Sequence, residues 1–153
     1  MPGYNTVLVG TDGSESSYRA VDRAAELAGA TGATLLLVCA FRPMSERDEK
    51  VAAAQLGDLA YKVAGANPAE DILKEAATRA QKSGAGKVDT VAQAGDPVDV
   101  LCEIAGDRNV DLVVVGNRGL NSLAGRLLGS VPANVSHRAT TDVLIVHTTE
   151  GKR

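Results

Sequence analysis

The sequence predicts a single α/β domain, a doubly wound parallel sheet of five strands in the order 3-2-1-4-5 with helices on both faces. Apolar runs of strand length alternate with segments of helical periodicity along the chain, which indicates parallel strands joined by crossover helices. Several of these runs are apolar throughout, as in strands buried on both faces of a sheet. A length of 153 residues suits one core, so we expect one domain over residues 1–153.

The first elements alternate clearly. Tyr4 to Gly10 is an apolar, β-branched run that ends in glycine and predicts a strand. The turn residues Thr11 to Ser14 follow, and a helix with one apolar face begins there. We expect the glycines of residues 29–32 to end it. Thr34 to Ala40 is apolar throughout and predicts the second strand.

The segment from Phe41 to Asn67 is harder to interpret. A structureless loop of this length would be unusual, and apolar residues recur in it at helical spacing, so we expect part of it to be helical. Asn67 then predicts a helix cap, because a proline and, three residues on, a glutamate follow it. That helix is expected to run to about Ser83, where Gly84 and Gly86 close it.

Five more elements complete the pattern. They are a weaker strand around Val88 to Ala92, expected near an edge; a helix opened by Gly95-Asp96-Pro97 and running to about Asp107; a strand at Val110 to Val115; a helix from Gly129 and Ser130 to about Arg138; and a last strand at Val143 to His147.

The predicted strand order marks one edge of the sheet for a ligand. Ligands of doubly wound sheets bind beyond the carboxyl ends of the strands where the winding reverses, here the first and fourth. Those strands end at Gly10 and Gly116. Gly116 and Gly119 permit unusual backbone angles and close approach of a ligand, and a helix N-terminus at Gly129 and Ser130 offers unpaired N–H groups to an anion. The alternative is that these glycines only make tight turns.

Several other classes of protein are excluded. The chain has no G-x-x-x-x-G-K-[ST] phosphate loop, no G-x-G-x-x-G after its first strand and no G-x-S-x-G. Its two histidines lack metal-ligand spacing, so no metal site is expected. A net charge of −3 argues against a nucleic-acid partner, and the longest apolar run is too short for a membrane span. Without a secretion signal, and with Cys39 and Cys102 in apolar context, we expect a cytoplasmic protein with free thiols.

One combination of motifs resembles a known family. Gly116, Gly119, Gly129 and Ser130 match G-2x-G-9x-G-[ST], and the N-terminal strand and turn read TVLVGTDGS. With both motifs in register, nearly the whole chain resembles the universal stress protein family, in its ATP-motif branch and closest to small mycobacterial members that bind adenine nucleotides, including cyclic AMP. The resemblance implies a single nucleotide-binding domain with ATP or cyclic AMP as ligand, and with Mg²⁺ accompanying ATP.

The resemblance also implies roles by position. Gly10 and Thr11 would form the floor under the base, and Asp12 would reach the ribose or a phosphate-bound metal. The alternative for Asp12 is a helix cap and nothing more. The backbone at Cys39 and Ala40 would bond the adenine edge, and Val115 and Gly116 would line the sugar. The residues around the phosphates would be Asn117, Arg118, Gly119, Gly129, Ser130 and Val131. Pro132 removes one main-chain donor that could otherwise bond a phosphate, because proline has no N–H.

The resemblance implies a homodimer through the last strand, formed by Val143, Leu144, Ile145, Val146 and His147. An apolar edge strand would otherwise be an aggregation hazard, so pairing is also expected physically. We expect a stress-response binding module that acts as a sensor or nucleotide reservoir, because no catalytic base accompanies the phosphate motif. The alternative is an enzyme, a slow Mg²⁺-dependent ATPase or an autophosphorylating protein. The sequence does not separate ATP from cyclic AMP.

Overall fold

A computed structural model describes residues 3–42, 66–117 and 130–148. Its elements are β1 (Thr6–Gly10), α1 (Glu15–Thr31), β2 (Thr34–Phe41), α4 (Ala66–Lys82), β3 (Lys87–Ala94), α5 (Pro97–Asp107), β4 (Leu112–Gly116), α6 (Ser130–Arg138) and β5 (Asp142–Val146). The five strands form one sheet in the order β3-β2-β1-β4-β5, and every neighbouring pair is parallel. The predicted fold class is therefore confirmed, with β3 at an edge. The helical content expected within residues 43–65 lies outside the described residues.

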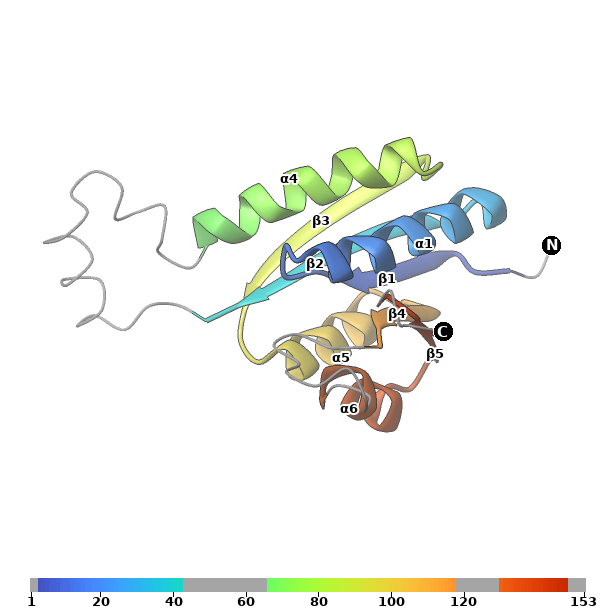
Figure 1. The fold of residues 1–153 in the computed structure, drawn as a ribbon. Helices are drawn as coiled ribbons and strands as arrows, with labels where there is room; N and C mark the ends of the chain where they lie inside the picture. The colour runs from blue at the N-terminus through green and yellow to red at the C-terminus, as the bar shows by residue number, and fades with distance from the viewer. Residues whose placement is uncertain (1–2, 43–65, 118–129, 149–153) are drawn as a thin grey trace, which may run out of the picture.

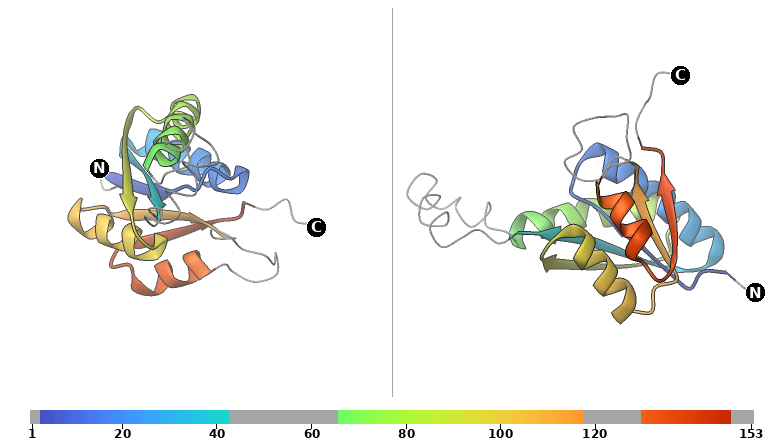
Figure 2. Two further views of the ribbon diagram at one scale, coloured as in Figure 1. Left: turned by 90° about the vertical axis from the view of Figure 1, so that its left-hand side faces the viewer. Right: turned by 90° about the horizontal axis from the view of Figure 1, so that it is seen from below.

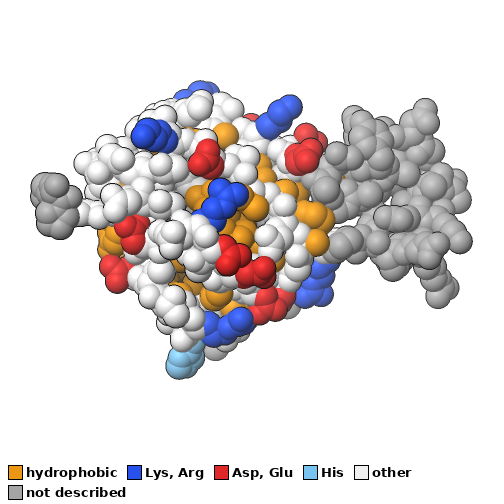
Figure 3. Space-filling model, turned by 180° about the vertical axis from the view of Figure 1, so that it is seen from behind, with side chains coloured by type: hydrophobic (Ala, Val, Ile, Leu, Met, Phe, Trp, Pro, Cys, Tyr) orange, Lys and Arg blue, Asp and Glu red, His pale blue; other side chains and the backbone are white. Residues whose placement is uncertain are grey.

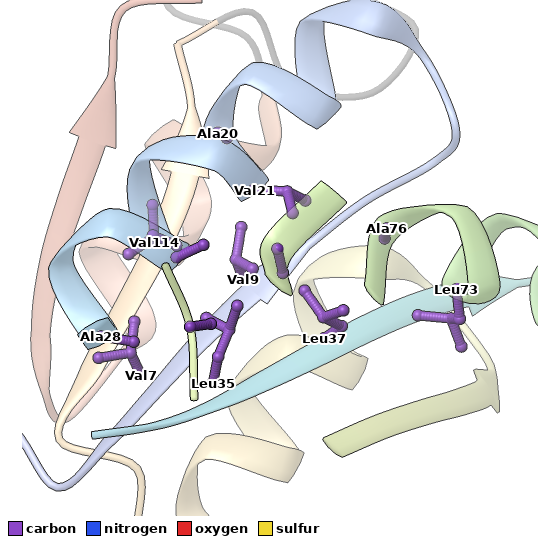
Figure 4. Packing of buried hydrophobic residues seen from close by; sticks show 14 of the residues in the cluster. Val7, Val9, Ala20, Val21, Ala28, Leu35, Leu37, Leu73, Ala76 and Val114 are labelled. Atoms are coloured by element: carbon purple, nitrogen blue, oxygen red, sulfur yellow. The ribbon is translucent and has the colours of Figure 1, made fainter. Parts of the chain in front are cut away.

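Helices cover both faces of the sheet (Figures 1 and 2). α1 and α4 lie on one face, and α5 and α6 lie on the other. The side chains of each central strand alternate between the two layers: Val7 and Val9 pack under α1 and α4, whereas Leu8 packs toward α5 and α6. Figure 4 shows the first of these cores, in which strand valines and leucines meet alanines of the helices. Burial on both faces explains why the central strands β1, β2 and β4 are almost entirely apolar.

Several element boundaries differ from the sequence prediction. α1 does end within the expected residues 29–32: its last residue is Thr31, and Gly32, with a left-handed φ of 73°, is the C-cap. α4 begins at Ala66, so Asn67 lies inside the helix and the prediction that it is the cap was wrong. Val110 precedes β4, because its N–H is bonded to the Ala105 carbonyl in the turn after α5. His147 follows the end of β5.

The surface carries charges of both signs. On the face drawn in Figure 3, acidic and basic side chains are interspersed among exposed hydrophobic atoms. Among the described residues, no helix is both long enough and apolar enough to cross a membrane. The expectation that nucleic acid is not a partner stays a prediction.

Candidate functional site

A pocket opens at the carboxyl ends of β1 and β4. It encloses about 400 Å³, including its open mouth, and is lined by Gly10, Ser14, Ser16, Ser17, Leu101, Val115, Gly116 and Val131. β1 and β4 are neighbours, and their crossovers lead to opposite faces of the sheet, so the pocket occupies the point where the winding reverses.

Two glycines at the ends of these strands make room inside the pocket wall. A Cβ on Gly10 would lie 3.1 Å from Leu101 Cδ2, and a Cβ on Gly116 would lie 3.0 Å from Thr148 Cγ2. Gly116 is not among the positive-φ glycines of the described chain, so the unusual backbone angle expected there is absent. The missing side chain at Gly116 leaves room for Thr148, whose side chain would collide with an added Cβ.

The turn from β1 to α1 is held by its own hydrogen bonds. Ser14 is the N-cap of α1, and its hydroxyl oxygen accepts from the Ser17 N–H at 3.1 Å. Asp12 is not that cap, although one of its carboxylate oxygens, Oδ1, accepts from the Ser14 N–H at 2.9 Å. Its second oxygen, Oδ2, makes no hydrogen bond to the described residues. Asp12 therefore supports the turn and retains one free acceptor.

The Thr11 hydroxyl is also engaged within this turn. Its oxygen lies 2.7 Å from the Ser17 hydroxyl and accepts from the Gly13 N–H at 3.2 Å. The Thr11 N–H donates to the Val38 carbonyl at 2.9 Å, which ties the turn to β2. Thr11 is buried and is not among the residues that line the pocket, and its hydroxyl is already bonded within the turn.

The end of β2 presents main-chain groups toward the same edge. Val38 bonds toward β1 through its carbonyl, and the Phe41 carbonyl accepts from Gly95 on the other side, next to β3. Because main-chain groups alternate along a strand, the N–H and C=O of Ala40 point toward β1, beyond the last β1 residue of the ladder. Cys39 points its main chain the other way. Burial raises the pKa of its thiol to about 11, so that thiol is protonated at neutral pH.

The residue after β4 is bonded to the chain that follows β5. Asn117 donates its N–H to the Val146 carbonyl at 2.8 Å, which continues the ladder with β5. Its side-chain oxygen, Oδ1, accepts from the N–H of Thr148 at 2.9 Å and from the hydroxyl of Thr148 at 3.0 Å. Its side-chain nitrogen, Nδ2, lies 3.3 Å from His147 Nδ1. The structure thus joins Asn117 to the chain beyond β5.

The remaining expected site residues are only partly described. Val131 is buried in the first turn of α6 and lines the pocket, and Ser130 begins that helix. Pro132 is the third residue of α6 and brings no N–H. The residues expected beside the phosphates that lie outside the described part of the chain are Arg118, Gly119 and Gly129.

The pocket wall contains residues that sequence reasoning did not assign to the site. The serines of the first turn of α1 were detectable, since hydroxyl residues gather at the start of a predicted helix beside the ligand edge. Leu101, which lines the pocket, and Thr148, which packs behind Gly116, had no local signal, because each comes near the pocket only through packing between elements distant in sequence.

The described donor set offers little to a metal ion. No group of three or more His, Cys, Asp or Glu residues in the described ranges is arranged to hold one. Asp12 supplies a single free carboxylate oxygen beside the pocket.

Comparison with known proteins agrees with this architecture. The model of the universal stress protein family matches residues 3–147. Universal stress protein Rv1636 of Mycobacterium tuberculosis is 54% identical over 149 residues, which cover 97% of this chain and 100% of that protein. Universal stress protein YxiE of Bacillus subtilis is 31% identical over 152 residues, covering 94% of this chain and 99% of that one.

A solved structure, a universal stress protein in complex with cAMP, superposes with a TM-score of 0.75 at 46% identity. The match covers 97% of this chain and 100% of the other. The fold of the parallel sheet with its strand order and the family match over residues 3–147 lead to the same assignment. This chain belongs to the universal stress protein family.

Proposed function

We propose that this protein binds an adenine nucleotide, cyclic AMP or ATP, in the pocket between β1 and β4. The observation that carries the proposal is the position of that pocket, where two strands end at glycines and α6 begins. The 46% identical relative that was solved with cAMP supports the choice of ligand. A binding module of this kind can serve as a sensor or reservoir, because it holds a nucleotide without consuming it.

The geometry suggests how such a ligand would lie. The main chain of Ala40, which points beyond the end of β1, would bond the adenine edge, and this favours Ala40 over Cys39. Asp12 would accept from a ribose hydroxyl through its free carboxylate oxygen. Gly116 and Val131 would border the sugar and phosphate, with the N-terminus of α6 toward the anion. Three or four charge-assisted hydrogen bonds, less the cost of immobilising the ligand, correspond to an affinity near the micromolar range.

Binding is favoured over catalysis by the same donor set. Phosphoryl transfer needs metal ions held by defined ligands and a residue that orients the nucleophile. Asp12 is the acidic side chain available at the turn, and its Oδ1 atom is already bonded to Ser14. If the protein were instead a slow ATPase, Mg²⁺-dependent turnover would occur and would disappear in Asp12→Ala.

Isothermal titration of the purified protein with cyclic AMP, AMP and ATP, with and without Mg²⁺, tests the proposal. We expect saturable binding of at least one of them, and loss of that binding in Gly116→Val with a preserved circular dichroism spectrum. Ser136→Ala is a matched control, because this exposed α6 hydroxyl has the Ala133 carbonyl as its one hydrogen-bond partner among the described residues. Failure of all three nucleotides to bind at millimolar concentration would refute the proposal.

We further propose that the protein forms a homodimer through β5. β5 pairs with β4 on one side only, and Leu144 and Ile145 are each 37% exposed, the large exposed hydrophobics of the described chain. Pairing of two such edges would satisfy the unpaired main-chain groups and cover this apolar surface. Light scattering is expected to give twice the chain mass for the wild type and a monomer for Ile145→Lys. Thr90→Lys on the opposite edge strand should remain dimeric, and a monomeric wild type would exclude the dimer.

A further inference from the structure

The three serines that line the pocket differ in what they can offer a ligand. Ser14, Ser16 and Ser17 all belong to the start of α1. Each hydroxyl has one proton to donate, and its partners determine where that proton goes. The direction of each hydrogen bond can therefore be derived from the groups around it.

Ser17 has no capacity left for a ligand. Its hydroxyl donates to the Ser14 carbonyl at 2.9 Å, since a carbonyl only accepts. Its oxygen must therefore accept from the Thr11 hydroxyl at 2.7 Å, and it also receives the Asp12 N–H at 3.4 Å. Ser14 is the opposite case. Its oxygen accepts from the Ser17 N–H, and its proton stays available at the pocket.

Ser16 is the unusual member of the set. The Thr148 N–H points at Asn117 Oδ1, which identifies that atom as the oxygen of the side-chain amide. The Thr148 hydroxyl lies 3.0 Å from the same oxygen and must donate to it. With its proton used, Thr148 Oγ1 can only accept from Ser16, whose hydroxyl oxygen is 2.6 Å away. The chain of donation thus runs from Ser16 to Thr148 to Asn117.

This series of hydrogen bonds is fixed by the surroundings of Thr148. Thr148 is 2% exposed, its carbonyl accepts from Arg19 Nη1 at 3.0 Å, and its methyl group packs against Gly116. Reversing the Ser16 proton would leave two acceptors facing each other at 2.6 Å. Ser16 therefore presents lone pairs to the pocket and no proton.

Resting on the adenine-nucleotide function proposed above, we infer that Ser16 is a specificity-determining residue that accepts a hydrogen bond from a sugar hydroxyl of the nucleotide. A phosphate oxygen is an acceptor and would be repelled at this point, whereas a ribose hydroxyl is a donor of the required kind. Asp12 at the same turn offers a second acceptor, so the two residues together read the ribose. Thr148 is a positioning residue that fixes the direction of the Ser16 hydroxyl.

The test compares ribose and deoxyribose ligands. Dissociation constants are measured for ATP, 2′-deoxy-ATP and 3′-deoxy-ATP, and for cyclic AMP and its 2′-deoxy form, on the wild type and on Ser16→Ala. One neutral hydrogen bond corresponds to about three- to ten-fold in affinity. We expect the wild type to bind one deoxy ligand more weakly by that factor. In Ser16→Ala the ratio should fall to about one, while the affinity for that deoxy ligand is unchanged.

The Thr148 variants test the direction of the bond. Thr148→Val keeps the side-chain shape but frees the Ser16 proton, so discrimination should fall as in Ser16→Ala, and Thr148→Ser should restore it. Ser136→Ala should discriminate like the wild type. Equal weakening of ribose and deoxyribose ligands by Ser16→Ala would overturn the inference, as would a wild type that binds them equally. Both results leave nucleotide binding intact, whereas failure of every nucleotide to bind refutes the proposed function and this inference together.

Discussion

Gly29→Ala gives a sharp test of the packing between α1 and the end of α4. Gly29 lies in the last turn of α1, where alanine is the better helix former by up to about 1 kcal/mol. Propensity alone therefore predicts that the substitution stabilises the protein. The structure predicts the reverse, because a Cβ on Gly29 would lie 2.4 Å from the main-chain oxygen of Gly84 and 3.0 Å from its carbonyl carbon.

The magnitude follows from the two opposing effects. Overpacking typically costs about 1–3 kcal/mol, and the upper end applies here because the obstacle is backbone. Gly84 has a φ of 114° and lies two residues after the end of α4, and its main chain cannot rotate aside as a side chain would. Less the gain of about 1 kcal/mol in helix propensity, the net loss is about 2 kcal/mol. For a domain of this length the midpoint of thermal unfolding should fall by about 4–8 °C.

Gly106→Ala is the matched control for this experiment. Gly106 lies in the last turn of α5, and a Cβ there would meet no atom within 4 Å. The free energy of unfolding of Gly106→Ala should rise by up to about 1 kcal/mol, so its thermal midpoint should stay the same or increase. Thermal and urea unfolding, followed by circular dichroism, measure both variants. A Gly29→Ala protein as stable as the wild type would refute the assigned contact.

Three further predictions concern other parts of the molecule. Arg79→Met should lower the free energy of unfolding by about 1–2 kcal/mol in urea titrations, because Arg79 Nη2 bonds the partly buried Asp22 carboxylate at 2.7 Å across α1 and α4. Because burial raises the pKa of the Cys39 thiol to about 11 from an ordinary value of 9.0, the unfolded chain loses this proton first as the pH rises. Stability should therefore fall between about pH 9 and 11 in the wild type and fall less in Cys39→Ala, and equal slopes would contradict this. Gly116→Ala should lower both the free energy of unfolding and the affinity for the nucleotide. Adding Thr148→Ser removes the methyl group that lies 3.0 Å from the new Cβ, so the double variant should regain the stability but not the affinity. If the double variant regains nucleotide binding as well, Gly116 serves packing only.

The fold was predictable because its strands are buried on both faces. Each central strand must be apolar at every position, and such runs are visible without any knowledge of the neighbours. The edge strand β3 was also recognisable, since its exposed positions carry Lys87, Asp89 and Thr90. Boundaries were less predictable because tertiary contacts set them: Asn109 adopts a positive φ of 52°, and the N–H of Val110 bonds back to α5.

The site was predictable as a location but not as a set of side-chain directions. Its place follows from strand order, which the alternation of elements already implies. The direction of the Asn117 side chain depends on Thr148, which is 31 positions further along the chain. No local pattern reports such a partner. The sequence could not show that the Asn117 side chain bonds Thr148, and the position of Asn117 near the phosphates stays a prediction.

The connection from Asn117 to Thr148 and Ser16 changes how the glycine motif is understood. Gly116 lines the pocket on one side and packs against Thr148 on the other. The residue that needs this glycine is thus the same residue that fixes the Ser16 hydroxyl. A side chain at position 116 would press on Thr148 and displace it from Ser16. The glycine, the hydroxyl and the end of β5 therefore act as one unit, in which the space for the ligand and the polarity of the wall depend on a single buried threonine.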